Sequence, residues 1–267
     1  MRGLRLATLL LTATGFLPGA SPAALVQQGA VDPDRLYAAR EDLTSALAAA
    51  DAWEARLTQD ARDYDSAWKL ARASYWIGSH VPAGERRKQY ERGIEAGRRA
   101  AALQPGRPEG RFWMAAAMGA MAESFGLRAG IRYRGPVKRE LEAVRRIDPA
   151  YSQGAADRAL GRWYFRVPRL FGGSRQKSVE HLQRSLTYDP ANAASHFFLA
   201  ETFFGMDRRE EARRELQHVL DAPEDAEWGP EVREFKQKAR ALMERPLSQT
   251  CPSASEGCCI QATVRSR

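Results

Sequence analysis

The sequence is poor in the residues that metal enzymes use most. It has only three cysteines and four histidines among 267 residues. His80, His181, His196 and His218 are scattered, without the spacing of a zinc motif. Nor does the chain contain several apolar runs of about 20 residues, the length that one membrane span requires. Composition thus excludes an elaborate metal enzyme and a membrane protein with several spans.

Lysine is also scarce, although the chain is strongly basic. Forty-one lysines and arginines against 33 acidic residues give a net charge of +8, and only six of the basic residues are lysine. An arginine-rich positive balance favours acidic partners or anionic surfaces, because the summed charge steers them toward the protein. With 44% hydrophobic residues, the chain can bury the core of one or two domains.

The amino terminus has the pattern of an export signal. Arg2 and Arg5 precede the apolar run 6–17, and small residues occupy the third and first positions before a cut after Ala23. A basic start, a dozen apolar residues and a small-residue exit are typical of a secretory signal peptide. We therefore expect residues 1–23 to be removed and the chain to be exported to a periplasm or cell envelope. A buried amino-terminal helix is the alternative, and the lack of a cysteine near the cut argues against a lipoprotein.

All the cysteines lie in the last segment of the chain. Cys251, Cys258 and Cys259 fall in a stretch rich in serine, proline and glycine that has no apolar periodicity. In an exported chain, three cysteines allow one disulfide and leave one thiol. The spacing matches neither a zinc knuckle nor a thioredoxin-type pair. We predict a flexible tail over 246–267 that the core does not need.

Between the two ends the apolar residues repeat with helical spacing. Val137, Leu141, Val144 and Ile147 recur at steps of four and three, with charged residues on the other face. This spacing predicts an amphipathic helix. No convincing run of alternating β-branched residues bounded by turn signals occurs in the sequence. The chain is therefore predicted to be all-α.

Prolines punctuate this helical region. Pro105, Pro149, Pro190 and Pro223 follow one another at intervals of 44, 41 and 33 residues. Each predicts a helix end, because the residue before a proline avoids the α region. The intervals are near the period of solenoids built from helix pairs. The last interval carries the small and apolar positions of a tetratricopeptide repeat: Leu199, Ala200, Phe203, Ala212, Leu216 and Val219.

These patterns predict a tetratricopeptide-like helix-pair solenoid of about four repeats. Helical caps are expected at both ends, because terminal repeats would otherwise expose apolar faces. The second cap is expected from about Pro230 to Met243. The predicted organisation is a signal peptide over 1–23, an amino-terminal helical cap over 24–62, the repeat domain over 63–223, a capping helix over 224–245 and the cysteine-containing tail over 246–267.

Several segments of the repeat region resemble a known family. The matching segments are 68–72, 93–97, 108–113 and 159–168, and the last one, which contains Leu160-Gly161-Arg162-Trp163, is followed by Gly-Gly-Ser at 172–174. These segments resemble the TatT-like T component of TRAP-associated tripartite transporters, a tetratricopeptide-repeat family. The resemblance implies a periplasmic α-solenoid that pairs with an extracytoplasmic solute-binding protein and, in some members, oligomerises. Members are often lipoproteins, and this chain lacks the cysteine that would be acylated.

No catalytic motif is found. The sequence has no Gly-x-Ser-x-Gly nucleophile elbow. Residues 172–178 are only superficially similar to a phosphate loop, since the first glycine is missing and the segment follows a predicted helix. We expect Gly172 and Gly173 to allow a tight reversal and Ser174 to cap the next helix, with a weak anion site there as the alternative. We expect neither enzyme activity nor a metal or other cofactor.

A basic cluster lies around the start of the amphipathic helix at 137–147. It consists of Arg128, Arg132, Arg134, Lys138 and Arg139, with Tyr133 among them, and the first four are the candidate steering residues. Basic residues with an interleaved aromatic could bind a nucleic acid, but an exported protein rarely meets one. We expect no nucleic-acid partner, and instead interpret the cluster as steering an acidic protein partner or an anionic ligand. The alternative is that these residues only solvate a loop–helix junction at 126–136.

Large aromatic residues recur in the first helices of the predicted repeats. First helices line the concave surface of a tetratricopeptide solenoid, so some of these rings are expected to face a groove, while most are expected to be core. Our candidate groove residues are Trp113, Trp163, Tyr164 and Phe197.

The sequence therefore predicts an exported, non-enzymatic repeat scaffold. The leading hypothesis, which follows from the resemblance, is a partner of a solute-binding protein of a TRAP-type system, with a small apolar or anionic solute as a further ligand. The alternative is a general repeat adaptor in envelope assembly that binds peptides or protein subunits.

Overall fold

The computed structural model describes residues 32–244. The predicted signal peptide over 1–23 and the cysteine-containing tail over 246–267 lie outside the described residues, so both stay predictions. Within 32–244 the chain forms α-helices and one short 3₁₀ helix, with no β-strand. The helices are α1 (Pro33–Ala38), α2 (Leu43–Gln59), α3 (Tyr64–His80), α4 (Ala83–Leu103), α5 (Glu109–Ser124), α6 (Gly126–Ile147), α7 (Tyr151–Arg166), η2 (Arg169–Phe171), α8 (Arg175–Leu186), α9 (Ala193–Gly205), α10 (Arg209–Asp221) and α11 (Gly229–Met243).

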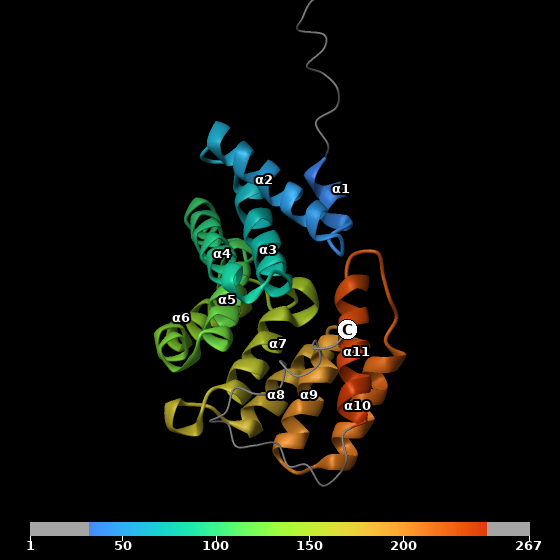
Figure 1. Ribbon diagram of the computed structural model, residues 1–267. Helices are drawn as coiled ribbons and strands as arrows, with labels where there is room; N and C mark the ends of the chain where they lie inside the picture. Colours follow the sequence, from blue (N-terminus) through green and yellow to red (C-terminus); the bar gives the residue numbers. More distant parts are fainter. Residues whose placement is uncertain (1–31, 245–267) are drawn as a thin grey trace, which may run out of the picture. The chain divides into compact units, whose positions relative to one another are not determined.

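The helices pack as consecutive antiparallel pairs, and the predicted all-α solenoid of tetratricopeptide type is confirmed. The pairs α3–α4, α5–α6, α7–α8 and α9–α10 follow one another along the chain (Figure 1). The first helices also contact each other, α3 with α5, α5 with α7, and α7 with α9. Helix α2 packs on α3 at one end, and α11 packs on α9 and α10 at the other.

Side-chain caps and prolines set many of the helix ends. Asp42 accepts the backbone N–H groups of Thr44 and Ser45 at 3.1 and 3.2 Å, which satisfies two of the unpaired donors at the start of α2. At the other ends, α4 ends at Leu103, two residues before Pro105, and α6 ends at Ile147, two residues before Pro149. Both helices end where the sequence predicts, because the residue before a proline avoids the α region.

One expected loop is helical instead. One interpretation of the basic cluster is that it solvates a loop–helix junction at 126–136. These residues instead belong to α6, which is continuous from Gly126 to Ile147 with Pro136 inside it. A proline in a helix interior removes one backbone hydrogen bond, and this cost makes it a helix breaker in sequence reasoning. The consequence is that the basic cluster is presented on a helix.

The turn after α7 is built as predicted. Ser174 accepts the backbone N–H of Lys177 at 3.3 Å and so caps α8. Gly172 has φ of 100°, and a Cβ on Gly173 would lie 1.7 Å from the carbonyl oxygen of Val167. Both positions therefore require glycine.

Two hydrophobic clusters form the core. The first draws on α1 to α7 and includes the fully buried Trp53, whereas the second draws on α8 to α11. In the second cluster the ring centre of Phe235 lies 5.4 Å from that of Phe197. Helix α11 is thus anchored to the carboxyl-terminal repeats by apolar packing.

A set of ion pairs joins the beginning of α11 to the first helices. Arg40, in the loop after α1, donates to both carboxylate oxygens of Glu231, at 3.2 and 2.5 Å, and to the carbonyl oxygen of Glu227. Arg233 pairs with Glu41 at 2.6 Å, and His80 contacts Glu234 at 2.5 Å. We call these contacts the polar seam, because they link residues about 150 to 190 positions apart through charge rather than apolar packing.

Candidate partner-binding groove

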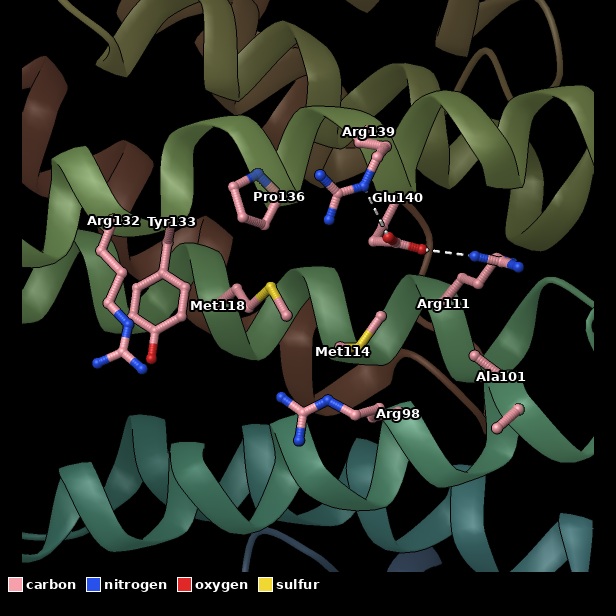
Figure 2. Close-up of a pocket in the computed structure, with 11 residues that line it drawn as sticks. Arg98, Ala101, Arg111, Met114, Met118, Arg132, Tyr133, Pro136, Arg139 and Glu140 are labelled. Atoms are coloured by element: carbon pink, nitrogen blue, oxygen red, sulfur yellow. Dashed lines mark hydrogen bonds and ion pairs between the residues drawn. The ribbon is translucent and has the colours of Figure 1, made fainter.

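A surface cavity lies between α4, α5 and α6. It measures about 510 Å³, within the range of binding sites in proteins. In Figure 2, Met114 and Met118 of α5 lie between Arg98 of α4 and the residues of α6. We call this cavity the partner groove. Its lining residues are Arg98, Ala101, Ala102, Arg111, Met114, Met118, Arg132, Tyr133, Pro136, Arg139 and Glu140.

Small residues let the helices under the groove approach closely. A Cβ on Gly97 of α4 would lie 2.8 Å from the Cβ of Met114, so a larger residue there would push α4 and α5 apart. Both methionines are largely buried. Because methionine is unbranched and polarisable, they give the groove a floor that can adjust to an apolar partner.

The rim of the groove is positively charged. Four arginines and one glutamate line it. Arg111 pairs with the Glu140 carboxylate at 2.7 Å and Arg139 pairs with it at 3.3 Å, so one acid is shared by two arginines. Arg132 has no ion pair within residues 32–244 and lies 5.2 Å from the Tyr133 ring centre. The rim therefore retains positive charge for an anionic partner.

Exposed apolar side chains precede the groove on α6. Leu127 and Ile131 lie one helical turn apart on α6, and both side chains are exposed. Ile131 directly precedes Arg132. Exposed apolar side chains next to a charged, partly apolar groove are characteristic of interaction surfaces. The amino-terminal half of α6 thus extends the surface that a partner could contact.

Of the four predicted steering residues, only Arg132 lines the groove. Arg134 lies 5.0 Å from the ring centre of Phe171. Lys138 lies 5.3 Å from the rings of both Trp163 and Tyr164 and 3.8 Å from a carboxylate oxygen of Glu142. Arg128 is exposed at the start of α6.

The predicted aromatic set is divided among different environments. Trp113 lines a second, smaller cavity. The Trp163 Nε1 donates to the carbonyl oxygen of Arg134 at 2.9 Å, and Tyr164 stacks on His181 with ring centres 5.3 Å apart. Phe197 belongs to the second core cluster. Trp163, Tyr164 and Phe197 line neither cavity.

Sequence reasoning missed Glu140, which organises the rim. The charge pattern assigns it to the charged face of the helix at 137–147, but it is buried and shared by two arginines. The signal was present in the spacing. Glu140 stands three residues after Val137 and four before Val144, on the apolar face of α6. An acid on that face predicts a buried ion pair.

Three histidines contact acids: His80 contacts Glu234, His181 contacts Asp157 and His196 contacts Glu215, whereas His218 stacks on His196. His196 Nδ1 lies 2.6 Å from the Glu215 carboxylate, and its Nε2 lies 2.9 Å from the carbonyl oxygen of Pro190. Burial lowers the pKa of His196, but these hydrogen bonds outweigh it and the net pKa is raised above its usual value. Within residues 32–244, no group of three or more histidines, cysteines and acids could hold a metal. No helix in the same range is long and apolar enough to cross a membrane.

Comparisons with known proteins show the family to which this chain is similar. The family model described as RMD1-3, regulator of microtubule dynamics protein 1-3, matches residues 32–247. The search of curated proteins gives no match. No enzyme family is indicated, and nothing in these comparisons confirms the TatT-like assignment, which stays a prediction.

A solved structure shows the same type of fold. A thermophilic tetratricopeptide-repeat protein of Thermus thermophilus has 20% sequence identity and a TM-score of 0.60, covering 79% of this chain and 97% of its own. Two structures of MamA have 16% identity and TM-scores of 0.47 and 0.46, covering 74% and 81% of this chain and 95% and 94% of their own. At this identity the first likeness shows a tetratricopeptide-type fold and nothing further.

Proposed function

We propose that this chain, which belongs to the regulator of microtubule dynamics protein 1-3 family, is a non-enzymatic scaffold that binds a protein partner in the partner groove. The chain has a tetratricopeptide-type helical-repeat fold, and such folds generally mediate protein–protein interaction, which supports the proposal. The observation that carries the proposal is the groove itself, in which four arginines surround a floor of two methionines.

This combination selects the chemistry of the partner. An amphipathic segment can place apolar side chains on Met114 and Met118 and acidic side chains against the rim. The methionine floor supplies apolar contact that tolerates different shapes. Arg98 and Arg132 are exposed, so they act mainly on the rate of association, which salt screens. The expected partner is therefore an acidic, amphipathic protein segment.

The finer assignment is also part of the proposal. The amino-terminal pattern supports export to a periplasm or cell envelope, and the TatT-like segments support a solute-binding protein of a TRAP-type transport system as the partner. The alternative remains a general adaptor in envelope assembly. The family's name refers to microtubule dynamics, so a microtubule partner is a third outcome that the same experiment can detect.

Charge reversal in the groove tests the proposal. The full chain is used as bait, and captured proteins are identified by mass spectrometry. Arg98→Glu and Arg132→Glu should each slow association with the main partner and so reduce its capture, most strongly at low salt. Arg146→Glu is the matched control, because Arg146 lies on the same helix as Arg132, is exposed and lines neither cavity.

The identity of the captured protein separates the three partners. A solute-binding protein supports the transport assignment, an outer-envelope assembly factor supports the adaptor, and tubulin supports the third outcome. Capture that both groove variants leave unchanged would show that the groove is not the binding surface.

A further inference from the structure

A second cavity of about 310 Å³ opens among α3, α5, α7 and the segment before α11. Four of its nine lining residues are aromatic: Trp68 from α3, Trp113 from α5, Tyr151 from α7 and Trp228 just before α11. We call it the aromatic cavity. Its volume is at the lower end of the range for small-molecule sites, so its size suits one aromatic ring system with a short polar group.

Two buried donors in the walls lack acceptors. Trp113 is 7% exposed, and its Nε1 makes no hydrogen bond. The neighbouring Tyr151 hydroxyl interacts with this group without completing a hydrogen bond of normal geometry. The Nε of Arg72 is also buried and without an acceptor. A buried donor without an acceptor destabilises the protein. A ligand that supplies an acceptor to these groups would remove that destabilisation.

The positive charge of Arg72 is only weakly neutralised. Its guanidinium carbon lies 4.3 Å from the ring centre of Tyr37 and 5.0 Å from that of Trp68. Among the described residues its one ion-pair partner is Glu227, at 3.9 Å, whose side chain is 66% exposed. An ion pair that long and exposed contributes little. A ligand carboxylate can therefore replace Glu227 at Arg72 at small cost.

The other acid in the wall is already satisfied. Glu109 accepts from Arg107 at 2.5 Å and from the Tyr64 hydroxyl at 2.8 Å. Burial raises the pKa of Glu109, but these hydrogen bonds outweigh it, and the net pKa is lowered. Because Glu109 has its own cation, it does not compete for Arg72.

The backbone at the edge of the cavity is strained. Ser152 and Gln153 have φ of 45° and 58°, in the left-handed region that side chains other than glycine rarely adopt. Arg158 holds their carbonyl oxygens at 3.5 and 3.4 Å. Such strain persists only where the surroundings impose it, and it concentrates at functional sites. Here it shapes the wall of the aromatic cavity.

We propose that the aromatic cavity binds a small aromatic carboxylate. The ring lies among the indoles of Trp68, Trp113 and Trp228, and the carboxylate accepts from Arg72 and Trp113. Planar ring contacts supply apolar burial, and the charge-assisted hydrogen bond to arginine fixes the orientation. This site is separate from the partner groove, so a test that contradicts one of the two proposals leaves the other unaffected.

Matched ligands test the charge requirement by titration calorimetry on the full chain. The probes are indole-3-acetate, its uncharged amide and tryptamine, which share the ring and differ in the polar group. The acid should bind at least about tenfold more tightly than the amide, a difference of about 1.4 kcal/mol. Equal affinity of acid and amide, preference for the cationic amine, or no binding of the acid by about 1 mM would each overturn the proposal.

Two tryptophan variants test the location. Trp113→Phe keeps a ring but removes the N–H, and it should weaken the acid at least about tenfold. Trp53→Phe is the control, because Trp53 is 0% exposed and also has an unpartnered Nε1, but it does not line the cavity. Equal effects of the two variants would contradict the assignment. If Trp113→Phe fails to fold, the acid–amide comparison on the unaltered chain decides alone.

Discussion

The most informative perturbation of the fold is Arg40→Met. Arg40 is 3% exposed and lies under α11, where it binds Glu231 through two nitrogens. Its guanidinium carbon also lies 5.0 Å from the ring centre of Tyr37 and 5.2 Å from that of Trp76. Methionine keeps the apolar length of the side chain but removes the charge and every donor. The substitution therefore isolates the electrostatic part of the polar seam.

The structure gives the size of the effect. Breaking a buried ion pair by removing one partner costs about 3–5 kcal/mol, because the remaining charge stays buried. Glu231 is partly exposed, which places the loss at the lower end, near about 3 kcal/mol. Burial raises the pKa of Glu231 even with Arg40 present. The desolvation cost of this carboxylate therefore exceeds the stabilisation that the ion pair with Arg40 supplies. The double variant Arg40→Met/Glu231→Leu should therefore recover more than half of the stability that Arg40→Met loses.

Urea unfolding followed by circular dichroism measures both variants. Arg233→Met is the control, because the pair of Arg233 with Glu41 belongs to the same seam but is exposed, so its loss should change stability little. A loss below about 1 kcal/mol for Arg40→Met, or a double variant less stable than the single one, would refute the reasoning.

Three further predictions concern stability. Gly173→Ala should destabilise the chain by about 1–3 kcal/mol, since its Cβ would meet the Val167 carbonyl, whereas Gly106→Ala has open space and should change the thermal midpoint little. Tyr164→Ala should cost about 3 kcal/mol of stability, because a buried aromatic is removed; an unchanged midpoint would instead favour a groove role. The raised pKa of His196 means that its contribution is full below its unfolded pKa and is lost as pH rises through the folded value. His196→Gln should therefore destabilise more at pH 6 than at pH 8, and equal losses in denaturant unfolding would contradict this.

Local signals in the sequence were sufficient for the fold. The helical spacing of Val137, Leu141 and Val144 indicated the apolar face that packs in α6, and these three side chains are buried. Pro105 and Pro149 indicated where α4 and α6 end. These features depend on residues a few positions apart, which is the range over which sequence periodicity and backbone restrictions act.

The sites were less predictable because they depend on distant contacts. Arg40 and Glu231 are 191 positions apart, and no local pattern relates them. The left-handed backbone at Ser152 and Gln153 contradicts local preference and is imposed by tertiary packing. The aromatic residues were correctly placed on first helices, but Trp113 lines a cavity while Tyr164 packs on His181. The three-dimensional packing of each ring decides that difference.

Site-specific photo-crosslinking in cells tests the scaffold function most directly. A photoreactive residue replaces Arg132 in the partner groove or Arg146 on the same helix, and crosslinked proteins are identified by mass spectrometry. The groove position should capture one defined protein with an acidic, amphipathic segment, and the control position should not. Crosslinks to that partner from Arg146 but none from Arg132 would contradict the account.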